Sequence, residues 1–169
     1  METTNFKTDL EIGERGEYVI ANYLKKNFNY QIEYNQDKDM KYDLKIKTPL
    51  LDYTLELKTD AYEYYKKRFT NNLFIETSCN NKKSGIIGSS ADIFAYYLPH
   101  LGELYIQKRK KLIEMMMYNQ DKFHYVTGCG DGGRVNGYLI NRYEFGEQFF
   151  TIKKIPINKK IIDYIYNDD

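Results

Sequence analysis

The chain of 169 residues carries 25 lysines and arginines against 24 aspartates and glutamates, so its formal net charge at pH 7 is +1. This balance provides no global field that would attract nucleic acid or an anionic membrane, although a local basic groove is sufficient to bind phosphates. The length predicts one domain over residues 1–169 with a single hydrophobic core.

Two cysteines, Cys79 and Cys129, are far apart and lack CxxC spacing, so they indicate neither a disulfide framework nor a zinc site. His100 and His124 complete no zinc signature with them. The N-terminal segment is polar, unlike a signal peptide, and no apolar run approaches the roughly 20 residues of a membrane-spanning helix. We therefore expect a soluble protein, with no membrane partner, in the cytoplasm or at the nucleoid of a host cell.

The first predicted element is a helix over residues 12–27, IGERGEYVIANYLKKN. Its apolar side chains recur at helical spacing, at Val19, Ile20, Tyr23 and Leu24. Alternation of apolar and polar residues then predicts three strands, at residues 30–34, 41–47 and 53–59. The TPLLD segment with Pro49 favours a turn between the last two strands.

The second half of the chain continues with mixed elements. Residues 60–72, DAYEYYKKRFTNN, predict a loop or an irregular helix, and residues 79–90, CNNKKSGIIGSS, a Gly/Ser-rich connection. Further strands are expected at residues 73–77, 91–98 and 103–107, the last two being paired across the PHLG turn. Residues 108–119 predict a second amphipathic helix, with Leu112, Met115 and Met116 facing a core.

Residues 124–141 predict a glycine-rich hairpin or a loop with strand ends. Their GCGDGG run lacks the lysine and Ser/Thr of a phosphate-binding loop, so we interpret it as a tight turn or a mobile loop. The order of helices and strands predicts an α/β fold with a mixed central sheet flanked by helices.

The hairpin KYDLKIKTPLLDYTLELKTD has one apolar face and one polar face. Alternation places Asp43 with the lysines of its strand, opposite Glu56 and Lys58 on the next strand. A solvated ladder of salt bridges would explain this pattern. A divalent-cation site would explain it too, because Mg²⁺ takes one or two carboxylates and keeps several waters.

The first helix adds a third carboxylate. Glu17 falls on the same helical stripe as Gly13, Ile20 and Leu24, whereas Glu14 lies off that stripe and is expected to be solvated. A carboxylate that faces the sheet is costly unless it is paired. Glu17 therefore predicts either a carboxylate cluster around a metal ion or an ion pair with a lysine.

These residues resemble the motif of the PD-(D/E)XK nuclease superfamily, which implies a restriction-endonuclease-like core. The helix glutamate matches Glu17, the strand aspartate matches Asp43, and the Glu-x-Lys match is Glu56-Leu57-Lys58. Tyr42 stands where the pattern has proline, a replacement that the superfamily often shows. A second stretch, NNLFIETSCNNKKSGIIGSSADIFAYYLP, and the later GCGDGGRVNGYLI are similar to small phage and giant-virus nucleases of this superfamily.

The resemblance implies Mg²⁺- or Mn²⁺-dependent hydrolysis of DNA phosphodiester bonds, as in viral DNA processing, repair or recombination. Asp43, Glu56 and the main-chain carbonyl of Leu57 would hold the ion, and Glu17 would orient it or help to hold a second one. Lys58 would position the attacking water and help to deprotonate it. Glu76, at the end of the next strand, would flank the metal, or else it is a surface carboxylate.

Two segments are candidates for contact with nucleic acid. Flexible Ser/Gly/Lys loops offer hydrogen-bond donors to phosphates, and basic stretches with tyrosines can stack on bases. The candidates are Lys82, Lys83, Ser84 and Ser90 in the first segment, and Lys66, Lys67 and Arg68, beside Tyr62, Tyr64 and Tyr65, in the second. A solvated loop and a plain tyrosine-rich surface explain the two segments equally.

Two other functions remain open from the sequence: a nucleic-acid-binding module that keeps the nuclease fold without turnover, and a salt-bridged interaction domain. The resemblance also raises the expectation of a homodimer, because superfamily members that cut both strands pair two sites.

Overall fold

The computed structural model describes residues 6–37, 41–129 and 132–166. In this part of the chain the strands form two sheets, and one sheet has six strands. In spatial order these are β1 (Gln31–Tyr34), β2 (Leu44–Lys47), β3 (Asp52–Thr59), β6 (Ile93–Leu98), β7 (Glu103–Lys108) and β10 (Thr151–Lys154). Strands β3 and β6 are parallel and the other neighbours are antiparallel, so the sheet is mixed.

The second sheet has four strands among the described residues. In spatial order these are β5 (Lys82–Lys83), β4 (Asn72–Cys79), β9 (Val135–Asn141) and β8 (His124–Cys129). All of its neighbours are antiparallel, and β8 and β9 form the hairpin expected over residues 124–141. Gly130 and Asp131 of the GCGDGG run lie outside the described residues, whereas Gly132 and Gly133 have positive φ angles typical of a turn.

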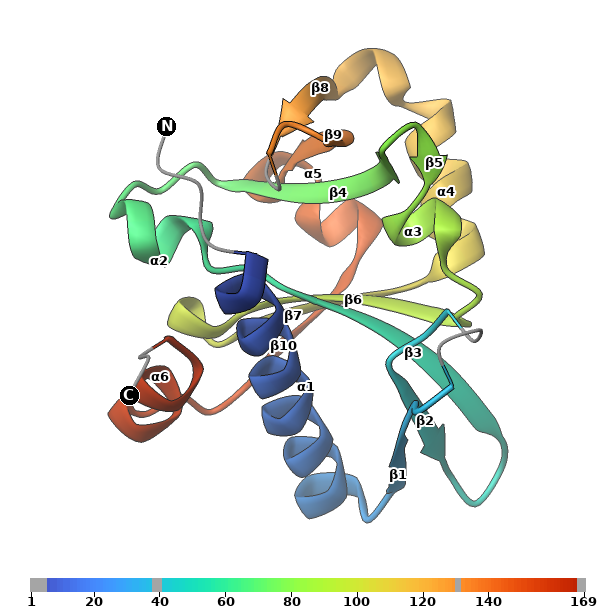
Figure 1. Ribbon diagram of the computed structural model, residues 1–169. Coiled ribbons are helices and arrows are strands. Elements are labelled where there is room, and N and C mark those ends of the chain that lie inside the picture. Colours follow the sequence, from blue (N-terminus) through green and yellow to red (C-terminus); the bar gives the residue numbers. More distant parts are fainter. Residues whose placement is uncertain (1–5, 38–40, 130–131, 167–169) are drawn as a thin grey trace.

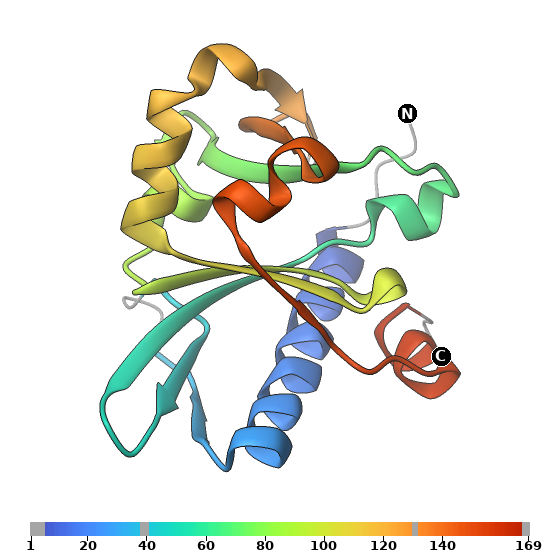
Figure 2. The ribbon, with the colours of Figure 1, turned by 180° about the vertical axis from the view of Figure 1, so that it is seen from behind.

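The helices lie on both faces of the six-stranded sheet (Figures 1 and 2). They are α1 (Phe6–Phe28), α2 (Tyr62–Lys66), α3 (Gly85–Gly88), α4 (Arg109–Tyr118), α5 (Arg142–Phe149) and α6 (Lys159–Tyr166), with 3₁₀ turns η1 (Pro99–Leu101) and η2 (Gln120–Lys122). The long helix α1 and helix α6 cover one face, and the four-stranded sheet with α4 and α5 covers the other (Figure 1). The predicted class, an α/β fold with a mixed sheet flanked by helices, is confirmed.

Two apolar clusters hold these layers together. One joins α1 and α6 to the six-stranded sheet and takes side chains from β2, β3, β6 and β7. The other joins both sheets to α4 and α5, but its side chains from the six-stranded sheet come from β6, β7 and β10. Strands β2 and β3 therefore have one face packed against α1, and their opposite face is left available for a site.

Most predicted elements are present, with shifted ends. Helix α1 begins at Phe6 rather than at residue 12, and the expected strand 41–47 begins only at Leu44. The connection 79–90 contains strand β5 and helix α3, and residues 60–72 contain the short helix α2. Helices α5 and α6, strand β10 and the division into two sheets were not predicted.

Candidate metal and phosphodiester site

The main-chain path of residues 41–43 opens a groove between the two sheets. The main-chain N–H of Asp43 still donates to the Leu55 carbonyl over 2.9 Å, but before this point the chain leaves β3. The Lys41 carbonyl instead accepts hydrogen bonds from the Ser89 hydroxyl and from the Ser90 main-chain N–H. Strand β2 therefore separates from β3 at Asp43, and a groove forms where the two strands diverge.

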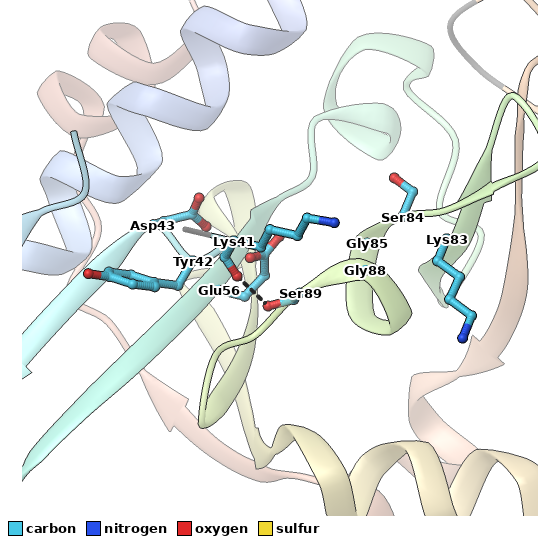
Figure 3. A pocket seen from close by; sticks show the side chains of 9 residues that line it. All are labelled: Lys41, Tyr42, Asp43, Glu56, Lys83, Ser84, Gly85, Gly88 and Ser89. Carbon is cyan, nitrogen blue, oxygen red and sulfur yellow. Dashed lines mark hydrogen bonds between the residues drawn. The ribbon is translucent and has the colours of Figure 1, made fainter. Parts of the chain in front are cut away.

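The groove is open to solvent and has a volume of about 350 Å³. Its lining residues are Lys41, Tyr42, Asp43, Glu56, Lys83, Ser84, Gly85, Gly88 and Ser89. Figure 3 shows Asp43 and Glu56 on one side, Ser84 and Lys83 on the other, and Ser89 between them. The groove thus brings together the predicted acidic pair and part of the predicted Ser/Gly/Lys loop.

Asp43 occupies the position left by the missing strand partner. Its carboxylate accepts a hydrogen bond of 2.6 Å from the Leu57 main-chain N–H, which would otherwise lack a partner at the point of divergence. The sequence predicted a regular strand here with Asp43 on the polar face, and the observed position lies instead just before β2. Burial raises the pKa of Asp43, and the hydrogen bond from Leu57 opposes this shift.

Glu56 lies in the middle of β3 and faces the groove. Burial is the main reason why its pKa rises to about 7, and the negative charge of Asp43 adds to the effect. The hydroxyl of Ser89, as a hydrogen-bond donor, and the positive charge of Lys58 act in the opposite direction. Asp43 and Glu56 therefore repel each other in a partly desolvated place, and a cation would relieve this repulsion.

Helix α1 brings Glu17 to the same acidic group. A Cβ atom at Gly16 would lie only 2.0 Å from Thr59 Oγ1, so glycine is needed for the close approach of α1 to β3. Glu17 is half-buried and Glu14 is exposed, as expected from the helical stripe. Burial and then the charge of Asp43 raise the pKa of Glu17 to about 8, with smaller contributions from Glu14 and Glu56.

The three carboxylates do not form a closed metal-binding cage. In the described ranges, no group of three His, Cys, Asp or Glu side chains is close enough to hold one ion together. Glu17 influences Asp43 from the helix side but does not line the groove. Asp43 and Glu56 fit a hard divalent cation that takes two carboxylates and keeps waters for its other positions.

The salt-bridge explanation of the hairpin is correct at its other end. Lys45 pairs with Asp52 at 3.3 Å, and Lys47 pairs with Glu33 of β1. By contrast, among the described residues neither Asp43 nor Glu56 has a cation within ion-pair distance. The polar face of the hairpin therefore consists of an ordinary ion-paired end and an acidic end at the groove.

Lys58 and Glu76 also lie near the acidic pair. Lys58 is exposed two residues after Glu56 on β3 and lowers the pKa of Glu56 electrostatically. Glu76 of β4 raises that pKa, and its carboxylate accepts a hydrogen bond from the Ser84 hydroxyl. Gly85 allows this arrangement, because its φ angle is +50° and a Cβ there would lie 2.4 Å from the Glu76 carbonyl oxygen.

The predicted phosphate contacts divide into two groups. Lys82 and Lys83 are exposed on β5, and Lys83 lines the groove. Ser84 and Ser90 use their hydroxyl groups within the protein, the first toward Glu76 and the second toward the Lys41 carbonyl at 3.3 Å. Their role in phosphate binding stays a prediction.

In the basic stretch, Lys66 ends α2, and Lys67 and Arg68 follow it. All three residues are exposed, but none of them lines the groove. Tyr64 of this stretch stacks on Tyr166 of α6, with the ring centroids 3.9 Å apart, and the Lys67 ammonium lies 4.1 Å from the Tyr64 ring centroid. Packing within the protein therefore explains part of the tyrosine pattern that was considered for stacking on bases.

Sequence reasoning missed Ser89, which caps the end of α3 and donates its hydroxyl to the Lys41 carbonyl. The segment SGIIGSS was recognised as a loop of interest, but which of its serines faces the groove depends on the fold of α3. Ser89 is buried and its hydroxyl also accepts a hydrogen bond from the Ala91 main-chain N–H.

No protein-family model and no curated protein sequence matches the chain. Among solved structures, the chain is similar to "The structure of a bacterial homing endonuclease: I-Ssp6803I", with 15% sequence identity and a TM-score of 0.47 over 63% of this chain and 71% of that chain.

Proposed function

We propose that this protein is a metal-dependent nuclease of the PD-(D/E)XK type that hydrolyses phosphodiester bonds of DNA. The observation that carries the proposal is the acidic pair Asp43 and Glu56 in an open groove, without a cationic partner among the described residues and next to Lys58. Two desolvated carboxylates that repel each other are unfavourable for the isolated fold, and a bound divalent cation removes the penalty.

Asp43, Glu56 and the main-chain carbonyl of Leu57 would hold Mg²⁺ or Mn²⁺. When bound, such an ion lowers the pKa of water and polarises a phosphoryl oxygen. The Leu57 N–H fixes one oxygen of the Asp43 carboxylate, so that the remaining lone pairs of the carboxylate are available to the ion. The half-buried Glu17 is close enough to Asp43 for their charges to interact, and it would orient the ion or its water.

Lys58 supplies a cationic side chain close to Glu56. It is exposed beside the groove and close enough to Glu56 to affect its pKa. A lysine ammonium in this position would hold the attacking water, help it to lose its proton by lowering its pKa, and offset the charge of the phosphate. The open shape of the groove is suited to a polymer that passes through it rather than to an enclosed small molecule.

The direct test is incubation of the purified protein with plasmid and with single-stranded DNA, in Mg²⁺, in Mn²⁺ and in chelator. We expect cutting that depends on the metal and is lost in Lys58→Ala. Lys45→Ala is the matched control, because Lys45 lies on the same hairpin but pairs with Asp52. Binding without cutting would indicate a nucleic-acid-binding module without turnover. The absence of both binding and cutting would refute a role on DNA.

A further inference from the structure

Helix α4 begins with a run of cations that helix stability does not explain. Lys108 precedes the helix, and Arg109, Lys110 and Lys111 form its first turn, which contains no acidic residue. The N-terminal end of a helix carries a partial positive charge, so cations there are unfavourable and carboxylates are favourable. Helix α5 shows the stabilised arrangement, with the Asn141 side chain capping its N-terminus and Glu144 in its first turn.

Arg109 connects this basic turn to the wall of the groove. Its guanidinium donates to the Ala91 carbonyl at 2.9 Å and to the Ile86 carbonyl at 3.1 Å, and its main-chain N–H donates to the Asp92 carbonyl. Ile86 belongs to α3, whose Gly85 and Gly88 line the groove. The start of α4 therefore lies directly behind the groove wall that α3 forms.

The three lysines around Arg109 have no comparable structural task. Lys108, Lys110 and Lys111 are exposed, and in the part of the chain that the structure describes none of them makes an ion pair. Lys41 and Lys83 line the groove on the other side of α3. A chain with a net charge of only +1 thus has cations on both sides of this wall.

We propose that Lys108, Lys110 and Lys111 bind backbone phosphates of DNA that continues past the α3 wall of the groove. That the cleaved bond lies in the groove rests on the proposed function, but phosphate binding by these three lysines requires no cleavage. Exposed ammonium groups contact phosphates without reading bases, and each contact releases counterions. The repulsion between these lysines and the partial positive charge of the helix N-terminus is then compensated in the complex, where the phosphates lie at the positive end of α4.

The test is DNA binding in chelator, measured by fluorescence anisotropy with a labelled duplex over a series of salt concentrations. All proteins carry Asp43→Asn so that no substrate is cut. In the triple variant Lys108→Ala, Lys110→Ala and Lys111→Ala, we expect the slope of log Kobs against log salt to fall in magnitude by about 1 for each lysine, or about 3 in total. The thermal midpoint of the triple variant should equal or exceed that of its parent, because cations leave the helix N-terminus.

The matched control is Lys159→Ala with Lys160→Ala. These lysines also lie in a first helical turn without acidic residues, that of α6, but on the opposite face of the six-stranded sheet (Figure 1). The control should keep the parent's salt slope. An unchanged slope in the triple variant, or an equal loss per lysine in the control, would overturn the proposal.

Two further measurements keep the outcomes separate. Should the triple variant fail to fold, the single variants Lys110→Gln and Lys111→Gln are measured in the same way, each with an expected slope change of about 1. Cleavage is assayed separately in protein with the native Asp43. A reduced salt slope in the triple variant, together with no metal-dependent cleavage by the protein with native Asp43, would refute the proposed nuclease function and support phosphate binding by the three lysines. An unchanged slope together with metal-dependent cleavage would refute phosphate binding by these lysines and support the nuclease function.

Discussion

Two sites with partly or fully buried carboxylates differ in what surrounds these carboxylates: one site is built around Glu63, and the other contains Glu17, Asp43 and Glu56. Glu63 of α2 is 4% exposed, and its carboxylate forms a two-point ion pair with Arg142, at 2.9 and 3.2 Å. It also accepts from the Thr70 and Asn71 main chain and lies 3.2 Å from His100 Nε2. Burial alone would raise the pKa of Glu63, but these hydrogen bonds outweigh it and lower the pKa to about 2.

At the groove, Glu17 and Glu56 show the opposite result, because the effects that raise their pKa values are the larger ones. The pKa of Glu17 rises to about 8 and that of Glu56 to about 7, because burial and neighbouring carboxylates outweigh the opposing effects, which at Glu56 come from Ser89 and Lys58. Both arrangements use the same side-chain chemistry, so the difference lies in the partners. The Glu63 carboxylate, with its full set of donors, joins α2 to α5, whereas carboxylates that repel one another are suited to bind a divalent cation that the chain itself does not supply.

The largest effect should follow from neutralising the groove carboxylates. Asp43→Asn keeps an oxygen that accepts from the Leu57 N–H, and Glu56→Gln keeps the shape of the side chain. We expect each to reduce metal-dependent cleavage by at least about 100-fold, the scale of losing one electrostatic contributor to a transition state. Stability should stay equal or increase, because a repulsion is removed.

The measurements are initial cleavage rates and thermal midpoints of the same protein samples. Glu33→Gln and Asp52→Asn are the controls, since these carboxylates belong to the ion-paired end of the hairpin. Unfolding of Asp43→Asn or Glu56→Gln would count against the metal site and for a structural ion-pair role.

The next largest effect is expected in the Glu63 network. Arg142→Ala leaves a buried carboxylate without its cation, and we expect the free energy of unfolding to fall by about 3–5 kcal/mol. Urea unfolding measures this change, with the exposed Arg134→Ala as control. The double variant Glu63→Gln with Arg142→Met should recover part of the loss, and a double variant no more stable than Arg142→Ala would contradict this account.

The dependence of stability on pH should separate the two groups. Glu63 titrates lower in the folded protein than in the unfolded chain, so its contribution is present above about pH 4.5 and is lost as the pH falls toward about 2. Glu17 and Glu56 titrate higher when folded, so the folded state holds more protons and stability falls as the pH rises from about 4.5 to about 8.

Unfolding midpoints measured in chelator over this pH range test the prediction. Mn²⁺ should remove most of the decline above pH 4.5. The double variant Glu17→Gln with Glu56→Gln should reduce the decline to the part that Asp43 causes, without changing the loss of stability at acid pH. An undiminished decline in the double variant would show that other groups cause it.

The smallest effect is expected at Ser89. Its hydroxyl donates to the Lys41 carbonyl and accepts from the Ala91 N–H, and it lowers the pKa of Glu56. Ser89→Ala should cost about 1 kcal/mol of stability and raise the pKa of Glu56, which shifts the pH dependence of metal-dependent cleavage upward. Ser90→Ala, an exposed neighbour that also bonds to the Lys41 carbonyl, should leave that profile unchanged. Equal profiles for both variants would contradict a positioning role for Ser89.

The comparison of the two groups also shows where sequence reasoning stopped. Glu63 lies inside the stretch DAYEYYKKR, where its neighbours favoured a basic surface for nucleic acid. Its partner Arg142 is 79 residues away, at the start of a helix that was not predicted. No local pattern indicates that these two side chains meet, because α2 and α5 are brought together only by the packing of two sheets.

What the sequence determined by itself was the local periodicity: helix α1 with Glu17 on its sheet-facing side, the hairpin of β2 and β3, and the alternation that gives Glu56 and Lys58 a common face. These features follow from side-chain direction within one element. The tertiary structure decided where β2 leaves β3, that Asp43 binds the Leu57 N–H there, and that Ser89 faces the groove. These features depend on contacts between segments far apart in the chain, and the acidic group exists only where α1, the hairpin and α3 pack together.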